Sequence, residues 1–458
     1  MAYGKVQLPK ILSGNMVLQQ NTSVRLWGEA KPGARVTVRV SWDKKKHVTE
    51  VDGEGRWLIK IQTPEASYTP QHFEVSDGDG TVRADNILIG EVWLCSGQSN
   101  MEMPLGGFLD SSTEEGNEAI AEAGLKQGIR VLTVKRTGAH VPVDTCANGW
   151  KVCNAENAPE FSAVGYFFAE RLNRILDVPV GVICTSYGGS RIEGWLPREI
   201  VQNYKDIDLS RAELKNKRGW HAGVPTIMYN SMLYPFKNYT IKGFLWYQGE
   251  ANIHQHADYA ERMKTLVKRW REDWGLGELP FYMAEIAPFD DDGKLDRALL
   301  REAQYKAVSE LTNCGIVCTN DLVLPEERNQ IHPRQKRAIG DRFAYLALHN
   351  DYGYKNIECV SPTYKNMEVK DTAIVVHFNN VKGFSTQAYY EGFEICGSDR
   401  VFHPAQAKTD YRTMTVRVWS DRVKHPVAVR YCFRDFQIGT LKTNRLLPFA
   451  PFRTDDFE

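Results

Sequence analysis

Residues 87–101 read Ile87-Leu-Ile-Gly-Glu-Val-Trp-Leu-Cys-Ser-Gly-Gln-Ser-Asn-Met101. As far as Leu94 the run is almost continuously apolar, which is typical of a strand in a parallel sheet that is covered on both faces. Gly97 permits a tight turn after this strand, so we expect the hydroxyl of Ser99 at the edge of the sheet. Position 101 is Met and not Gly, which disfavours the nucleophile elbow of α/β-hydrolases.

Further strand-like runs follow, and they alternate with helical periodicity. The runs are short and apolar, and they span residues 180–185, 243–247, 280–284 and 315–319. Two stretches between them carry apolar residues at helical spacing: Val164, Phe168, Leu172 and Ile175 in one, and Tyr259, Met263, Leu266 and Trp270 in the other. Buried strands that alternate with amphipathic helices predict an α/β domain, with a parallel sheet and helices on both of its faces.

Alternating apolar and polar residues indicate β structure on both sides of this region. The expected strands are separated by turn residues, and they span 23–27, 35–40 and 57–61 before the region and 373–378, 414–419 and 427–431 after it. We therefore predict three domains. These are an N-terminal β-sandwich over 1–87, a central α/β domain over 88–352 and a C-terminal antiparallel β domain over 353–458.

Composition narrows the class of protein. The 458 residues include 57 basic and 57 acidic side chains, and this zero net charge argues against nucleic acid or an anionic membrane as the main partner. No stretch approaches the roughly 20 apolar residues of a membrane-spanning helix. Among the nine cysteines, we expect Cys314 and Cys318 to be buried thiols, since no second ligand pair completes a zinc site with them. The sequence leaves the oligomeric state and any disulfide pairing open.

Polar, glycine-rich segments follow the predicted strands at the edge where parallel sheets bind ligands. These segments contain Ser99, Gly188, Gly189, Gln248 and His332. Ser99 is a candidate nucleophile, and His332 is the candidate base that would take its proton. Pro333 suits the first position of a helix, so we expect His332 at a helix N-terminus, where the dipole favours the neutral ring.

The same segments supply candidates for stabilising the oxyanion of an acyl transfer. The backbone amides of Ser99 and of Gly188 or Gly189, together with the carboxamide of Gln248, are suitable donors. Each of these residues also has a structural interpretation, as a turn glycine, a strand-end cap or a helix cap. The catalytic interpretation is favoured only because all of these residues are predicted to lie at one edge of the sheet.

Six motifs together identify a resemblance. They are Gly90-Glu-Val-Trp-Leu-Cys-Ser-Gly-Gln-Ser-Asn-Met101, Gly188-Gly-Ser-Arg-Ile-Glu-Gly-Trp195, Tyr229-Asn-Ser-Met232, Trp246-Tyr-Gln-Gly-Glu250, Leu300-Arg-Glu-Ala-Gln304 and Ile331-His-Pro333. With them the chain resembles, over nearly its whole length, the sialate O-acetylesterase family of the SGNH hydrolase superfamily. The resemblance implies a flavodoxin-like SGNH sheet, with Ser99 as nucleophile and His332 as general base.

The resemblance also implies an oxyanion hole made of Ser99, Gly188 or Gly189, and Gln248. It implies four further site residues, which either bind the substrate or position the residues that bind it. They are Gln98, Asn100, Glu250 and Arg301. For Glu250 and Arg301 a structural ion pair is the alternative. The aromatic residues that could stack on a sugar or belong to the core are Tyr187, Trp195, Trp220 and Tyr247.

The function implied is a serine esterase that removes O-acetyl groups from carbohydrate, above all from sialic acid, and that needs no metal or organic cofactor. The alternatives are an esterase for acetylated xylan or another glycan, a non-catalytic glycan-binding protein on a degenerate core, and, less favoured, an SGNH lipase.

The first residues do not form a signal peptide. Because family members are often exported, we expect a periplasmic or secreted protein whose leader is absent from this sequence, with the cytoplasm as the alternative.

One position departs from the family pattern. Such enzymes usually carry an aspartate two or three residues before the histidine, and here Asn329 and Gln330 occupy those positions. Loss of a triad acid costs about 10⁴-fold in activity in a well-studied protease. The nearby carboxylates that could replace it are Asp321, Glu326 and Glu327. The other interpretation is a Ser–His dyad whose ring is oriented by a backbone carbonyl.

Overall fold

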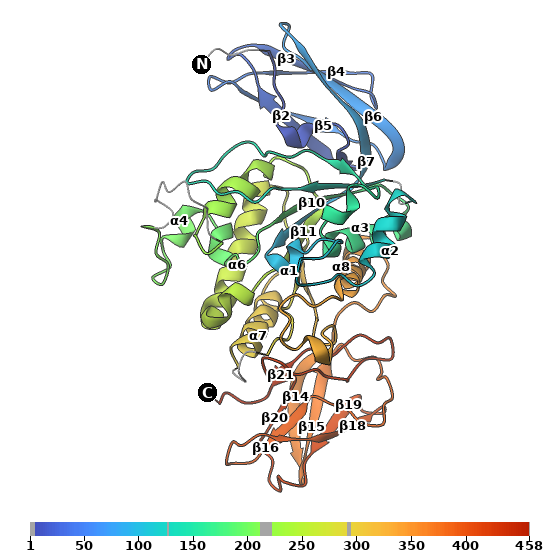
Figure 1. Cartoon of the computed structure of the whole chain (residues 1–458), viewed down its shortest axis with the longest axis vertical. Helices are drawn as coiled ribbons and strands as arrows, with labels where there is room; N and C mark the ends of the chain where they lie inside the picture. Colours follow the sequence, from blue (N-terminus) through green and yellow to red (C-terminus); the bar gives the residue numbers. More distant parts are fainter. Residues whose placement is uncertain (1–4, 126–127, 211–221, 291–294, 458) are drawn as a thin grey trace. The chain divides into compact units, whose positions relative to one another are not determined.

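The computed structural model describes residues 5–125, 128–210, 222–290 and 295–457 (Figure 1). It divides into two compact units. The first comprises Met1–Ala251 and Thr265–Phe281, and the second comprises Asn252–Lys264 and Tyr282–Glu458. The chain passes from one unit to the other after Ala251, within α6, His256–Trp274, and within β12, Phe281–Ala284.

The first unit begins with two small sheets, as the alternating pattern predicts. Their strands are β1 Val17–Gln19, β2 Ser23–Glu29, β3 Arg35–Val40, β4 Lys46–Glu50, β5 Arg56–Gln62, β6 Ser67–Ser76 and β7 Thr81–Gly97. β2 pairs with β5 alone, while β4, β3, β6 and β7 form an antiparallel sheet that β1 joins in parallel to β7. On β3 the side chains of Val36, Val38 and Val40 are buried and their neighbours are not, so one face of the strand packs inward.

The long strand β7 belongs to two sheets (Figure 1). Its first half, up to Ile89, pairs with β6, and its second half, from Glu91 to Gly97, pairs with β10, Val180–Ser186. The predicted boundary between residues 87 and 88 therefore falls inside one continuous strand, on which the candidate site is directly mounted.

The second half of β7 lies in a largely parallel sheet. The strand order in this unit is β11-β7-β10-β8-β9, with β8 at Ile129–Thr133, β9 at Lys151–Val152 and β11 at Gly243–Tyr247. Every residue of β10 and β11 is buried, which explains their continuous apolar runs. Ser186 and Tyr247 both lie opposite Gly97, so three strands end at the same level.

The periodicity predicts two helices, and both are present, as α3, Ala163–Leu176, and as α6. Four α-helices are described within the first unit alone. They are α1 Ser99–Glu102, α2 Gly116–Glu122, α3 and α4 Arg198–Val201. On the predicted face of α3, Val164, Phe168 and Leu172 are completely buried, and Ile175 is partly buried. Ser162 caps this helix by accepting the Gly165 N–H at 3.1 Å.

The second unit contains β12 and its neighbour β13, Cys314–Val317, together with α7, Asp296–Ser309, and α8, Lys336–Asp351. The prediction that Pro333 opens a helix is wrong, since α8 begins at Lys336. The physical reason is that Glu327 binds the backbone N–H of Arg334 at 3.0 Å and holds this segment as a loop. His332 consequently lies four residues before the first residue of the helix.

Two antiparallel sheets of four strands each form the C-terminal part of the second unit. One has the order β14-β15-β19-β18 and the other β17-β16-β20-β21. Their strands are β14 Thr363–Lys370, β15 Ala373–Asn379, β16 Phe393–Cys396, β17 His403–Pro404, β18 Gln406–Asp410, β19 Thr415–Trp419, β20 Ala428–Tyr431 and β21 Phe452–Arg453. Apolar residues of both sheets share one core, so the predicted fold class is confirmed.

Three further observations concern the described parts of the chain. No helix in them combines the length and the apolar character required to cross a membrane. The nine cysteines are all free thiols, and Cys318 is buried as the sequence predicts, whereas Cys314 is only partly buried. No group of three or more potential metal ligands gathers among the described residues.

Candidate active site

Ser99 lies on a turn that leads from the end of β7 directly into α1. β7 ends at Gly97, whose φ of +138° is a backbone conformation that favours glycine. Ser99 is the first residue of α1, so its N–H has no partner inside the helix, and no described residue of the same unit accepts it. Gln98 and Asn100 are buried, whereas Ser99 is partly exposed. The turn therefore presents one hydroxyl and one amide at the carboxyl end of the sheet.

The loop that follows β10 lies next to this turn. The Tyr187 N–H donates to the carbonyl oxygen of Gly97 at 3.0 Å. The Gly188 N–H donates to Oε2 of Glu102 at 2.8 Å, so this amide already has a charged acceptor. Gly189 is exposed with φ +73°, and no described residue of its unit accepts its N–H. Of the two predicted glycine donors, Gly189 has the available amide.

Gln248 lies directly after β11 and is completely buried. Its Nε2 donates to the carbonyl oxygen of Ser190 at 3.0 Å. Ser190 is fixed in turn, because its Oγ accepts from Nε1 of Trp195 at 2.9 Å and donates to the carbonyl of Gly97 at 3.4 Å. The loop after β10 thus holds the carboxamide of Gln248 in one orientation.

Gln98 and Asn100 tie the serine turn to the segment that follows β11. Oε1 of Gln98 accepts the N–H groups of Gly249 at 3.2 Å and Ala251 at 3.3 Å. Nδ2 of Asn100 donates to Oε1 of Glu250 at 2.6 Å, and both of these side chains are buried. These contacts give Gln98, Asn100 and Glu250 the geometry of positioning residues.

Two charged residues that the sequence reasoning missed, Glu102 and Arg136, complete this part of the site. Nε and Nη2 of Arg136 donate to the two carboxylate oxygens of Glu102, with 2.6 Å between Nη2 and Oε2. Arg136 follows β8, a strand of five residues that has no glycine motif after it. Glu102 continues the serine motif by one residue, and this adjacency was the only available signal.

His332 belongs to the second unit, where it is partly buried. Its backbone N–H donates to Oε1 of Gln330 at 3.1 Å. Gln330 is one of the two residues that replace the usual aspartate, and here its side chain supports the backbone at the histidine.

Two of the carboxylates that could replace the aspartate close the loop before His332. Oε1 of Glu326 lies 2.9 Å from Nη2 of Arg334. Glu327 accepts the backbone N–H of Leu324 at 3.1 Å through Oε2 and that of Arg334 at 3.0 Å through Oε1. Both carboxylates therefore have structural partners within this loop.

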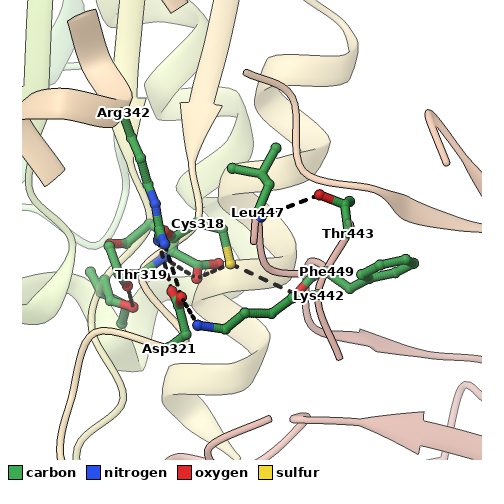
Figure 2. A network of polar contacts seen from close by, with 10 residues as sticks. Cys318, Thr319, Asp321, Arg342, Lys442, Thr443, Leu447 and Phe449 are labelled. Atoms are coloured by element: carbon green, nitrogen blue, oxygen red, sulfur yellow. Dashed lines mark hydrogen bonds and ion pairs between the residues drawn. The ribbon is translucent and has the colours of Figure 1, made fainter. Parts of the chain in front are cut away.

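Asp321, the third such carboxylate, lies in a buried ionic network (Figure 2). Its oxygens lie 2.7 Å and 2.9 Å from the guanidinium nitrogens of Arg342, and 2.8 Å from Nζ of Lys442. Burial acts to raise the pKa of Asp321, but the hydrogen bonds and charges of Arg342 and Lys442 hold this pKa below its usual range. Asp321 is thus an ionised structural residue that links the segment after β13 to α8 and to the C-terminal sheets.

Arg301, which lies on α7, is 1% exposed. Nη1 donates to Oδ1 of Asn320 at 3.2 Å, and Nη2 donates to the carbonyl oxygens of Cys432, at 3.2 Å, and Arg434. These contacts satisfy buried backbone groups. Arg301 therefore connects α7 to the C-terminal sheets.

The four aromatic candidates divide by exposure. Trp195 and Tyr247 are completely buried and belong to the core. Tyr187 is partly exposed, and the guanidinium of Arg136 lies 5.5 Å from the centre of its ring. Trp220 lies outside the described residues.

Comparison with known proteins identifies relatives along the whole chain. The family model described as a carbohydrate esterase, sialic acid-specific acetylesterase, matches residues 89–349, a range that contains both Ser99 and His332. A sialate O-acetylesterase of Pongo abelii is 27% identical over 494 residues, covering 96% of this chain and 91% of its own. The human sialate O-acetylesterase is 27% identical over 440 residues, covering 88% of this chain and 80% of its own.

A solved structure has the same fold over the same length. It is that of a carbohydrate acetylesterase from Xanthomonas citri, which is 31% identical to this chain. The match covers 99% of this chain and 100% of the other, with a TM-score of 0.87. The fold and the sequence thus point to the same group of proteins.

Proposed function

Since this chain belongs to the family of carbohydrate esterases described as sialic acid-specific acetylesterases, we propose that it removes O-acetyl groups from sialic acid. The curated relatives that share its full length carry the name sialate O-acetylesterase. The observation that carries the chemical part of the proposal is the partly exposed Ser99 on its constrained turn. Its own N–H and that of Gly189 have no acceptor among the described residues of their unit.

The proposed reaction is a two-step acyl transfer. Ser99 Oγ attacks the acetyl carbonyl carbon while His332 takes the hydroxyl proton. The tetrahedral intermediate collapses to an acetyl-enzyme, and the imidazolium of His332 returns the proton to the departing sugar oxygen. Water, deprotonated by His332, then attacks the acetyl-enzyme. As the bond between the acetyl carbon and Ser99 Oγ breaks and acetate leaves, the imidazolium returns its proton to Ser99 Oγ, which regenerates both residues.

The proposed oxyanion hole consists of the N–H groups of Ser99 and Gly189 and the carboxamide of Gln248. The Gly188 amide is left out because its N–H is donated to Glu102. Preorganised donors of this kind contribute about 10²- to 10³-fold each to the rate. Gln248 meets the requirement of preorganisation, since Ser190 fixes its orientation.

We propose that the enzyme uses a Ser99–His332 pair without a carboxylate from residues 321–330. The support is that Asp321, Glu326 and Glu327 all have structural partners. Arg301 is likewise left out of the proposed substrate contacts, because it is buried among backbone carbonyls.

The substrate is tested by acetate release from a panel of O-acetylated sialic acids and acetylated xylan oligosaccharides. We expect kcat/KM to be at least about tenfold higher for the sialic acid esters, because binding energy specific to one sugar raises this ratio. Equal or higher values for the xylan esters would contradict the proposed substrate. Enzyme with Ser99→Ala supplies the background rate.

We retain the periplasm or the cell exterior as the proposed location. The support is the resemblance to a family whose members are often exported. Fractionation of the producing cells tests it, and activity confined to the cytoplasmic fraction would contradict it.

A further inference from the structure

Arg136 is an exposed cation beside the candidate nucleophile. Half of its side chain is accessible, although Nε and Nη2 are both bound to Glu102. Glu102 stands on α1, three residues after Ser99, and it also accepts the N–H of Gly188. One carboxylate therefore fixes both the arginine and the loop after β10.

The position of the guanidinium relative to Ser99 follows from Gly188. A Cβ atom on Gly188 would lie 3.1 Å from Oε2 of Glu102, 3.3 Å from Nη2 of Arg136 and 3.4 Å from Cβ of Ser99. The three side chains thus converge on a single backbone position. A sugar whose ester reaches Ser99 has the guanidinium within the span of the same monosaccharide.

The stability of the fold does not by itself explain why Arg136 is paired with Glu102. An exposed ion pair contributes little to folding, because water screens the charges and two long side chains lose their freedom. The guanidinium is nevertheless held on three sides: by the two oxygens of Glu102 and by the ring of Tyr187, 5.5 Å from its centre. Only one N–H of Nε and one of Nη2 donate to Glu102, and no described residue accepts from Nη1, so three of the five guanidinium N–H groups, two on Nη1 and one on Nη2, are not used by Glu102.

We propose that Arg136 binds the carboxylate of sialic acid, and this inference rests on the proposed function. Among its differences from the neutral pentose of xylan, sialic acid carries a carboxylate, which is its only charged group. Arginine is the side chain best suited to bind a carboxylate, because its planar fork offers several directed N–H groups. Glu102 is a positioning residue in this scheme, since it orients the fork without touching the sugar.

Glu102 also determines how Arg136 is expected to recognise the carboxylate of the sugar. It neutralises much of the positive charge, and it raises the pKa of Arg136 through a hydrogen bond and by its charge. Attraction over long distances is therefore weak, and discrimination comes from hydrogen bonds made at close contact. Recognition should accordingly depend on the geometry of the fork and not on the positive charge alone.

The test compares an O-acetylated sialic acid with its methyl ester, in which the carboxylate is no longer charged. We expect Arg136→Gln to lower the ratio of kcat/KM for the acid over the methyl ester by about 10- to 100-fold, the effect of losing one charged hydrogen bond. Arg136→Lys should restore only part of the ratio, because an ammonium group lacks the fork.

The matched control is Lys135→Gln, which removes the same charge from the neighbouring exposed residue and should leave the ratio unchanged. An equal loss on both substrates with Arg136→Gln would overturn the inference, since it would show a structural role through Glu102. An unchanged ratio would overturn it as well. If the wild-type enzyme released acetate from neither sugar ester, the proposed function itself would fail, and this inference with it.

Discussion

Gly97 and Tyr247 lie so close across the sheet that a Cβ on Gly97 would stand 2.1 Å from the carbonyl oxygen of Tyr247. The two residues face each other in the register of β7 and β11. The same carbonyl accepts the N–H of Gln98 at 3.0 Å, which turns the chain toward Ser99. The absence of a side chain at Gly97 thus sets the path by which the candidate nucleophile leaves the sheet.

Gly97→Ala should therefore disrupt the turn. The new methyl group has to displace backbone, and φ of +138° is unfavourable for alanine, so we expect a loss of roughly 2–4 kcal/mol in the free energy of unfolding and most of the esterase activity. Urea unfolding and hydrolysis of p-nitrophenyl acetate measure the two effects. Gly124→Ala is the matched control, since a Cβ there has no neighbour within 4 Å. Equal stability of the two variants would contradict the account.

Asn100→Asp should place two carboxylates face to face. Nδ2 of Asn100 now donates to Glu250 at 2.6 Å in a buried environment, and the substitution replaces this donor with an acceptor. We expect a destabilisation of roughly 2–4 kcal/mol together with reduced activity. Glu250→Gln should cost less, because an amide oxygen can still accept from Asn100. Thermal unfolding of both variants checks this order, and the reverse order would refute it.

Glu326→Gln and Glu327→Gln should test the proposed dyad. Because both carboxylates serve the loop around Arg334, we expect each variant to keep kcat for acetyl esters within a few-fold of the wild type. A triad acid would show a loss nearer 10⁴-fold. Steady-state kinetics separates these outcomes, and a loss of that size in either variant would assign the missing acid to it.

Asp321→Asn should affect stability and its dependence on pH. Removing one partner of a buried ion pair costs about 3–5 kcal/mol, since the charges of Arg342 and Lys442 remain. The pKa of Asp321 is depressed in the folded protein, so its contribution is present above the ordinary value of about 4 and is lost as pH falls through the folded pKa. Unfolding measured from pH 3 to 7 should show this acid loss only in the wild type. Identical curves would contradict it.

Much of the fold was predictable because buried strands and helix faces consist of apolar residues, which form a recognisable pattern in the sequence. The strands β10 and β11 are buried throughout and appeared as apolar runs. The strand β8 did not, since Arg130 interrupts its apolar residues. The start of α8 was misplaced because a contact between side chain and backbone, from Glu327 to Arg334, overrides the preference of Pro333 for a helix start.

The candidate site divides in the same way. Gln98, Ser99 and Asn100 form one continuous motif, and the residues after β10 and β11 follow recognisable strands. Arg136 reaches the site from a loop without a motif, through a pairing with Glu102 that only the folded chain establishes. The acceptor of the Gly188 amide was equally invisible, because sequence does not show which donors are already used.

The most direct test of the account is covalent labelling of Ser99 by a serine-directed fluorophosphonate, followed by mass spectrometry of the labelled peptide. We expect one adduct per chain, on Ser99, with loss of acetyl ester hydrolysis in proportion to labelling. Ser99→Ala should take up no label and lose about 10⁴- to 10⁶-fold in kcat while it remains folded. Undiminished turnover in the Ser99→Ala enzyme, or an inactivating adduct on a different residue, would contradict the account.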